Sequence, residues 1–213
     1  MIRRWSPLNH NGSMTTEEKI QKIEKLRAQI AKCQRCRLHQ TRTNTVPGEG
    51  DVEAKILFIG EAPGRNEDLQ GKPFVGRAGD VFDRLLESIG LTRQTIYLCN
   101  ILKCRPPENR APLSDEIQAC VGSLDIQLKV VDSPVIAPMG NFAVTYIFQK
   151  FSIPFKKISD VHGKVFQAET PFGVKKVVPL FHPAVATYDN KKIDILLKDF
   201  QVLKDFLVKE IAA

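Results

Sequence analysis

Residues 55 to 60 read Lys-Ile-Leu-Phe-Ile-Gly, an apolar run that leads directly into a loop rich in Gly and Pro. Apolar runs of this kind are typical of strands that are buried on both faces of a parallel sheet. Ligands of such sheets bind at the carboxyl ends of the strands, in the loops that follow them. The stretch therefore predicts a central strand and places the search for a functional site in the loop after it.

Strands and helices alternate on both sides of this run. Thr15 and Glu18 form a capping box before a helix that should run from about residue 16 into the 30s. Further helices are expected over 81–89, from Ser114 as the cap to about 124, over 142–148 and over 193–207, and strands over 95–99, 134–137, 165–168 and 176–181, the last two as a hairpin. The order predicts an α/β fold, a three-layer α/β/α sandwich around a mainly parallel central sheet.

The composition is that of a globular protein. The chain has 213 residues, 43% of them hydrophobic and 26% charged, so it can bury a core without help from a disulfide or a metal. It has no run of 18 apolar residues and no secretory signal, so we expect it in the cytoplasm and away from membranes. Residues 1–14 are unpatterned and are expected to be a disordered extension or a cloning remnant, with a single domain over 15–213.

Positive charge is concentrated near the start of the chain. The net charge is +7, and residues 1–50 hold ten basic and four acidic side chains, so six of the seven surplus charges lie there. Lys and Arg side chains supply most of the non-specific affinity of proteins for nucleic acids. A solvated helix face would have the same composition, so charge alone leaves a nucleic-acid partner as one of two interpretations.

Four of the five cysteines fit a ligand set for a metal centre. Cys33 and Cys36 form a Cys-x2-Cys pair, and Cys104 and Cys120 are separated by fifteen residues. Disulfides are disfavoured in the reducing cytosol, so the set favours zinc or an iron–sulfur cluster, and the spacing does not choose between them. Four unrelated buried thiols are the alternative. Cys99 lies inside a predicted apolar strand and is interpreted as a core residue.

The loop after the first strand is dense in Gly, Pro and acidic residues. It matches neither a Walker loop nor a dinucleotide fingerprint. Its glycines would let the backbone approach a planar ligand, and Phe74 would be well placed to stack on one. The structural alternatives are a core plug for Phe74 and a solvated acidic loop for Glu61, Glu67 and Asp68.

Two other predicted strands end in polar side chains. Asn100 follows the strand 95–99, and His182 follows the strand 176–181. An Asn can read a donor and an acceptor on a base edge, and a His can hydrogen-bond an oxygen that becomes negative as a bond breaks. Taken singly, Asn100 is more often a turn residue and His182 a satisfied structural histidine. Their convergence with the glycine-rich loop at one sheet edge favours a binding site.

Together these motifs resemble one known family. The stretches Gly60-Glu61-Ala62-Pro63-Gly64, Gly71-Lys72-Pro73-Phe74-Val75-Gly76-Arg77-Ala78-Gly79, Asn100-Ile101-Leu102-Lys103-Cys104-Arg105-Pro106-Pro107 and His182-Pro183-Ala184, with the four cysteines, look like the family 4 uracil-DNA glycosylases. The resemblance runs from about Cys33 to the C-terminal helix. It implies the glycosylase fold and a monomeric enzyme of base excision repair that hydrolyses the N-glycosidic bond of deoxyuridine in single- or double-stranded DNA.

The resemblance also implies a role for each site residue. Cys33, Cys36, Cys104 and Cys120 would hold a [4Fe-4S] cluster. Phe74 would stack on the flipped uracil, Asn100 would read its Watson–Crick edge and His182 would face O2. Gly60, Glu61 and Ala62 would line the base and water pocket, with Glu67 nearby.

The chemistry of the reaction agrees with these roles. A base must leave the duplex before its glycosidic bond can be reached, and donors aimed at the uracil oxygens stabilise the leaving group. Related families carry an Asp at the position of Ala62 to orient water, so Glu61, Glu67 or backbone carbonyls must do so here, and Glu61 is our choice. No basic insertion precedes His182, which disfavours the related activity that attaches covalently to DNA.

Two rival interpretations use some of the same residues. A non-enzymatic zinc-bound nucleic-acid-binding module would need the basic residues and the four cysteines, and an electron-transfer protein would need only the metal centre. Neither of them needs Phe74, Asn100 and His182.

Overall fold

The structure is a computed structural model that describes residues 14–208. Its centre is a six-stranded sheet in the order β1-β3-β2-β4-β6-β5. The strands are β1 (Glu49–Gly50), β2 (Ile56–Gly60), β3 (Tyr97–Asn100), β4 (Val135–Pro138), β5 (Phe166–Thr170) and β6 (Gly173–Val177). Strands β3, β2, β4 and β6 run parallel, and β1 and β5 are antiparallel edges. The predicted mainly parallel sheet is confirmed.

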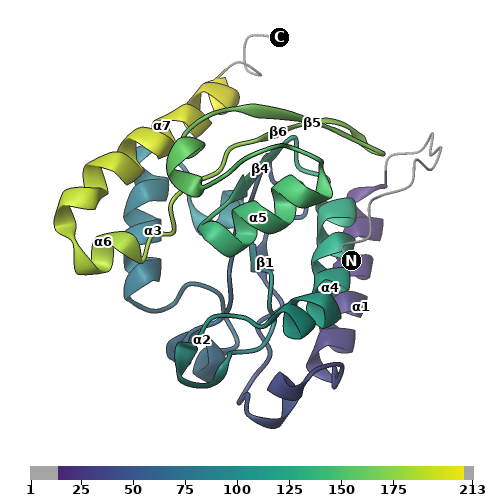
Figure 1. The fold of residues 1–213 in the computed structure, drawn as a ribbon. Helices are drawn as coiled ribbons and strands as arrows, with labels where there is room; N and C mark the ends of the chain where they lie inside the picture. Colours follow the sequence, from purple (N-terminus) through teal and green to yellow (C-terminus); the bar gives the residue numbers. More distant parts are fainter. Residues whose placement is uncertain (1–13, 209–213) are drawn as a thin grey trace.

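Helices cover both faces of the sheet (Figure 1). They are α1 (Thr16–Ala31), α2 (Arg65–Gln70), α3 (Arg77–Ser88), α4 (Ser114–Val131), α5 (Asn141–Lys150), α6 (Val185–Tyr188) and α7 (Ile193–Val208), with short 3-10 turns η1 (Arg37–Gln40), η2 (Arg93–Thr95), η3 (Pro107–Asn109), η4 (Ile158–Asp160) and η5 (Asn190–Lys192). One hydrophobic cluster joins α1, α4 and α5 to the sheet, and a second joins α3, α6 and α7. The chain therefore forms the predicted three-layer sandwich.

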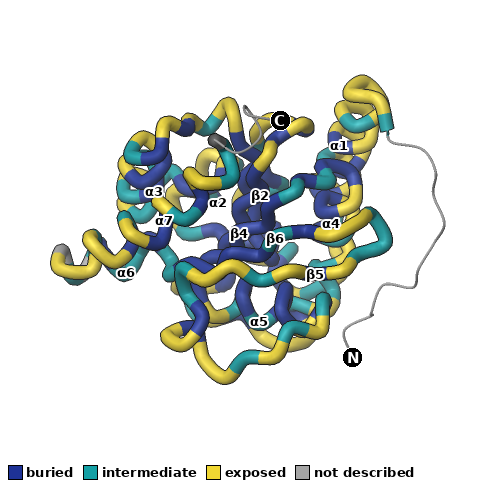
Figure 2. The backbone as a smooth tube through the Cα atoms, turned by 90° about the horizontal axis from the view of Figure 1, so that it is seen from above, coloured by how far each residue is buried: buried dark blue, intermediate teal, exposed yellow. Residues whose placement is uncertain are grey.

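The central strand explains why the sheet needs helices on both faces. Ile56 and Phe58 pack into the cluster with α3 and α7, and Leu57 and Ile59 pack into the cluster with α1 and α4. All five residues of β2 are buried, as the apolar run predicts. Figure 2 shows β2 and β4 coloured as buried at the centre, with exposed positions on the surrounding helices and along β5.

Among residues 14–208, none of the helices has the length and apolar character of a membrane span.

Several predicted boundaries move in the structure. Helix α3 begins at Arg77, before the predicted 81, and β3 begins at Tyr97 because Thr95 belongs to the 3-10 turn η2. The predicted cap at Ser114 is wrong: Leu113 is the N-cap, and the Glu116 carboxylate accepts its backbone N–H at 2.9 Å. The capping box of Thr15 and Glu18 is present.

The hairpin is confirmed, with the bounds of both strands shifted. Thr170 pairs with Gly173, so β5 and β6 meet across a shorter turn, and β6 ends at Val177 where a strand to 181 was predicted. Pro179 has no N–H to donate, which interrupts the ladder. Val178 and Leu180 still donate to carbonyls of β4, so the chain remains beside that strand as it approaches His182.

The largest omission is α2. The sequence predicts a loop over this segment, but a helix of six residues forms between Gly64 and Gly71. The helix is too short for an apolar period to reveal it. Of the predicted extension, residues 1–13 lie outside the described residues, and Met14 packs against the cluster formed with α1.

Candidate active site

A cavity of about 430 Å³ opens at the carboxyl edge of the sheet, where β2 and β3 end beside the chain that follows β6. Its lining residues are Glu61, Ala62, Gly64, Glu67, Phe74, Ala78, Asn100, Asn109, His182 and Ala184. Six of the seven predicted site residues outside the metal set are among them. The seventh, Gly60, pairs with Asn100 in the β2–β3 register beneath the cavity.

Asn100 lies over Gly60, where no larger residue would fit. A Cβ atom at position 60 would stand 2.2 Å from the Asn100 Oδ1 atom and 2.9 Å from the Phe74 ring. Asn100 is 2% exposed, and its Oδ1 has no hydrogen-bond partner among the described residues. Buried polar atoms are almost always paired, so this oxygen at the wall of a cavity indicates a position for a ligand donor.

Phe74 forms another wall of the cavity. Its ring packs on Phe82 in the core, with ring centroids 5.2 Å apart, and stacks beside His182 at 5.5 Å. The side chain is 5% exposed. The predicted stacking surface and the alternative core plug therefore describe one ring, which is anchored in the core on one side and contributes to the cavity on the other.

His182 offers one ring nitrogen to the cavity as a donor. The Ala184 backbone N–H donates to its Nδ1 at 3.2 Å, which fixes Nδ1 as an acceptor and leaves the proton of the neutral ring on Nε2. Burial lowers the pKa of His182 to about 4, so the ring is neutral at physiological pH. A neutral imidazole with a fixed tautomer is a donor that needs no rearrangement when charge develops nearby.

Glu61 is the unpaired carboxylate of the cavity. It lies directly after β2, is half-buried, and has no hydrogen-bond or ion-pair partner for its side chain among residues 14–208. Burial raises the pKa of the Glu61 carboxyl above its ordinary value. Ala62, beside it, supplies no polar group. Glu61 is therefore free to hold a water or a ligand proton.

Glu67 and Asp68 lie on α2, and neither is the solvated loop acid of the structural alternative. The Glu67 Oε1 atom accepts the backbone N–H groups of Val75 at 2.8 Å and Gly76 at 2.9 Å. Asp68 is buried and accepts the backbone N–H of Thr43 with both oxygens. Both carboxylates thus organise the backbone near the cavity.

Sequence reasoning missed four lining residues. Gly64 is the N-cap of α2, and Ala78 lies in the first turn of α3. Ala184 lies two residues after His182. Asn109 comes from the turn η3, has a φ of +55° and accepts a hydrogen bond from Arg105 at 2.7 Å. Its place just beyond the quoted Asn100–Pro107 motif was the available signal.

The four predicted cysteines come together away from this cavity. Cys33 and Cys36 follow α1, Cys104 follows β3 and Cys120 lies on α4, and all four line one small cavity with Arg35, Arg42 and Lys103. No group of three or more ligating side chains within the described ranges is arranged around a single ion. A zinc ion and an iron–sulfur cluster can each take four thiolates.

Basic groups approach these sulfur atoms, as an anionic cluster requires. Arg42 donates to Cys104 Sγ at 3.1 Å, Arg35 donates to Cys33 Sγ at 3.3 Å, and the Lys103 backbone N–H donates to Cys120 Sγ at 3.3 Å. Burial opposes ionisation of the Cys33 thiol, but the hydrogen bonds of Arg35 outweigh it and lower the pKa. Burial raises the pKa of Cys120 to about 11. The donor set fits an iron–sulfur cluster. Cys99 is fully buried in β3, the predicted core residue.

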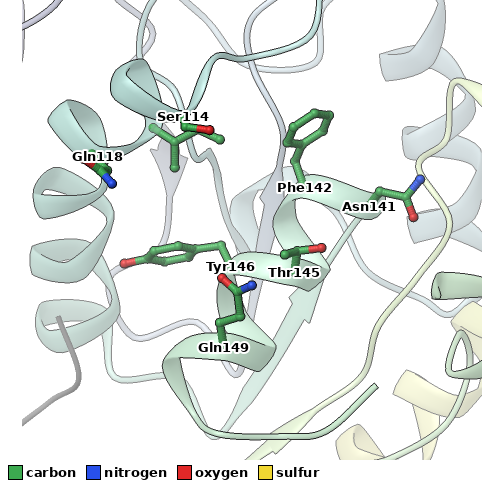
Figure 3. A pocket seen from close by; sticks show the side chains of 8 residues that line it. Ser114, Gln118, Asn141, Phe142, Thr145, Tyr146 and Gln149 are labelled. Atoms are coloured by element: carbon green, nitrogen blue, oxygen red, sulfur yellow. The ribbon is translucent and has the colours of Figure 1, made fainter. Parts of the chain in front are cut away.

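A second hollow, of about 380 Å³, lies between α4 and α5 (Figure 3). It is lined by Ser114, Ile117, Gln118, Asn141, Phe142, Thr145, Tyr146 and Gln149. Tyr146 is the titratable residue among these eight, and its hydroxyl donates to Asp125. None of the predicted chemistry falls here, so the cavity at the sheet edge is the candidate active site.

Comparisons with known proteins find one matching family. The profile of the Uracil DNA glycosylase superfamily matches residues 47–207. The chain is 41% identical over 191 residues to the type-4 uracil-DNA glycosylase of Archaeoglobus fulgidus, which spans 90% of this chain and 96% of that protein. It is 43% identical over 181 residues to the type-4 enzyme of Saccharolobus solfataricus (84% and 83%) and 39% identical over 201 residues to that of Thermotoga maritima (92% and 100%).

Proposed function

The chain belongs to the uracil-DNA glycosylase superfamily, with type-4 relatives over most of its length, and from this premise we propose how its cavity releases uracil from DNA. The protein is a uracil-DNA glycosylase, a hydrolase of DNA repair that leaves an abasic site. The observation that carries the proposal is the buried, unpaired Asn100 oxygen at the wall of a cavity shared with Phe74 and His182. Neither a non-enzymatic zinc-bound nucleic-acid-binding module nor an electron-transfer protein requires this arrangement.

Asn100 selects uracil. Uracil presents an acceptor at O4 and a donor at N3, and the amide of Asn100 matches them with its NH₂ group and its unpaired Oδ1. Cytosine presents the reversed pattern and would leave the buried amide unpaired, which sites of this kind reject strongly. Phe74 supplies the stacking surface for the extruded base.

His182 stabilises the leaving group. The glycosidic bond breaks with positive charge on the sugar and negative charge on uracil, so a donor at O2 strengthens as the bond lengthens. The Nε2–H of the neutral His182 ring is this donor, because the Ala184 N–H occupies Nδ1. It acts without first losing or gaining a proton at neutral pH, since burial lowers its pKa to about 4.

Glu61 positions the attacking water. Of the two acids in the cavity, Glu67 uses Oε1 to accept the amides of Val75 and Gly76, whereas the Glu61 carboxylate has no partner within the described part of the chain. Ala62 offers no polar side chain to share the task. The ionised form of Glu61 accepts a proton of the water and holds its oxygen toward the sugar.

Cys33, Cys36, Cys104 and Cys120 would hold a [4Fe-4S] cluster. When bound, the cluster would supply a structural crosslink among the end of α1, the chain after β3 and α4. Arg35 and Arg42 would offset its negative charge through their hydrogen bonds to sulfur. Because the four cysteines do not line the substrate cavity, no step of the hydrolysis depends on them.

A cleavage assay tests this function. Single-turnover release of uracil is measured on matched single- and double-stranded oligonucleotides that carry one deoxyuridine or one deoxycytidine. We expect release of uracil and no release of cytosine, and loss of uracil release in Asn100→Ala. Asn141→Ala, which truncates an exposed Asn at the second hollow, is the matched control and should cleave normally. Equal activity of Asn100→Ala and wild type would refute the reading role.

A further inference from the structure

Phe74 holds its place at the cavity in an unfavourable backbone conformation. Its φ is +54°, in the left-handed region that bulky residues seldom adopt, so its surroundings must impose it. The loop packs directly against Gly79 on α3, where a Cβ atom would stand 1.8 Å from the Phe74 carbonyl oxygen. The ring therefore reaches the cavity only while this loop is held in its present form.

Arg93, at the start of the turn η2, holds the loop through two of its backbone carbonyl oxygens. Its guanidinium donates to the carbonyl oxygen of Pro73 at 3.0 Å and to the carbonyl oxygen of Phe74. Asp83 on α3 orients the guanidinium with two hydrogen bonds of 2.7 and 3.2 Å, and Glu49 lies 3.5 Å from it. Planar guanidinium groups make such multiple contacts in a fixed geometry, which a Lys cannot reproduce.

Glu67 holds the same peptide group from the other end. Its Oε1 accepts the N–H of Val75, which is the amide partner of the Phe74 carbonyl, and also the N–H of Gly76. The Phe74–Val75 peptide is thus fixed at its oxygen by Arg93 and at its hydrogen by Glu67. The strained φ of Phe74 would relax by rotation of the preceding Pro73–Phe74 peptide, and that rotation would break the bond from Arg93 to the Pro73 carbonyl oxygen at 3.0 Å.

We propose that Arg93 and Glu67 are positioning residues that clamp the loop Pro73–Gly76 so that the Phe74 ring forms the stacking wall of the uracil cavity. The inference rests on the proposed function, because it assigns the clamp through the stacking role of Phe74. Arg93 does not line the cavity, so its effect on the reaction passes through that ring.

The test is a double-mutant cycle between Arg93→Met and Phe74→Ala, read by the single-turnover cleavage rate and by inhibition with free uracil. Both variants remove base–aromatic stacking, so each single variant should lose on the order of tenfold in rate and in uracil affinity. In the Phe74→Ala background, Arg93→Met should cost less than about twofold, because residues that act as a unit are not additive. Arg84→Met, an exposed cation on α3, is the charge-matched control.

The outcomes separate the clamp from the proposed function. If Phe74→Ala cleaves like wild type, the stacking role fails, and the clamp fails with it. If Phe74→Ala is impaired and Arg93→Met is not, only the clamp is overturned. Losses that multiply in the double variant also overturn it, as they would show that Arg93 acts elsewhere.

Glu67 provides a second test if Arg93→Met does not fold. The Glu67→Gln variant keeps a side-chain oxygen that can accept both amides, so it should lose far less activity than Glu67→Ala. Equal losses in the two variants would mean that the charge of Glu67 matters, as for a catalytic base, and would contradict the clamp.

Discussion

At the scale of single residues, the site works because its polar atoms are prepared before the substrate arrives. Asn100 is held unpaired against a glycine, His182 has one ring nitrogen assigned, and Glu61 is left without a partner among the described residues. The unpaired Asn100 oxygen costs folding free energy, because buried polar atoms prefer to be paired. The cost indicates a position kept for a ligand donor.

His182→Ala should lower the single-turnover rate by about a hundredfold to a thousandfold, which is the usual loss for one donor to a developing oxyanion. The affinity for uracil-containing DNA should change far less, because the bond strengthens only as uracil leaves. Binding is measured separately by fluorescence anisotropy, with circular dichroism to verify folding. A variant that cleaves at the wild-type rate would restore the structural-histidine interpretation.

The pH profile should report Glu61. Burial raises its pKa above 4.5, and the ionised form is the active one, so the rate should rise with pH through a value higher than that of an exposed Glu. His182 should add no inflection near 6.5, because its pKa is about 4. Single-turnover rates of wild type and Glu61→Gln across pH 4–9 provide the measurement. If the rate of Glu61→Gln still falls below about pH 6.5, the assignment of the profile to Glu61 and the low pKa of His182 would both be contradicted.

At the scale of elements, Lys103 joins the end of β3 to α4. Its buried ammonium donates to the Asn100 carbonyl at 2.6 Å and to Gln127 Oε1 at 2.6 Å, and its backbone N–H reaches Cys120. Asn100 and the helix that carries Cys120 thus share one buried cation. Helix α2 is only six residues long, yet it also joins separate segments. Glu67 accepts the backbone N–H groups of the loop that follows it, and Asp68 accepts that of Thr43.

Lys103→Met should destabilise the protein by about 1–3 kcal/mol, because it leaves the Asn100 carbonyl and the Gln127 oxygen without their donor. At this chain length each kcal/mol lowers Tm by roughly 2–4 °C. Thermal unfolding followed by circular dichroism measures the change. Lys198→Met, at an exposed position on α7, is the control and should unfold like wild type. Equal Tm values for the two variants would refute the bridging role.

At the scale of the whole molecule, three distant parts of the chain meet at the cysteines and three meet at the cavity, and the segment 100–109 contributes to both. Protein purified without oxygen should contain about four iron and four sulfide per chain, because four thiolates suit a [4Fe-4S] centre. Cys120→Ser should lose iron and unfold at lower temperature, whereas Cys99→Ala, which truncates the buried cysteine outside the set, should keep its iron. Iron, sulfide and zinc analyses decide, and stoichiometric zinc in place of iron would contradict the cluster.

The sequence by itself determined the sheet, because five consecutive buried residues of β2 leave no face for water and demand helices on both sides. It also identified the cysteine set and nearly all of the polar residues of the cavity, since parallel strands deliver their carboxyl ends to one edge. These conclusions follow from patterns among nearby residues, which can be recognised without knowing which distant segments those residues contact.

Only the tertiary structure decided what the individual groups do. Glu61 and Glu67 are both acids of one loop in the sequence, yet the fold gives Glu67 two backbone N–H groups and leaves Glu61 free within residues 14–208. The left-handed Phe74 and its contact with Arg93, nineteen residues away, leave no periodic signal. Hydrogen-bond partners and backbone strain depend on which distant segments meet, and periodicity carries no record of that.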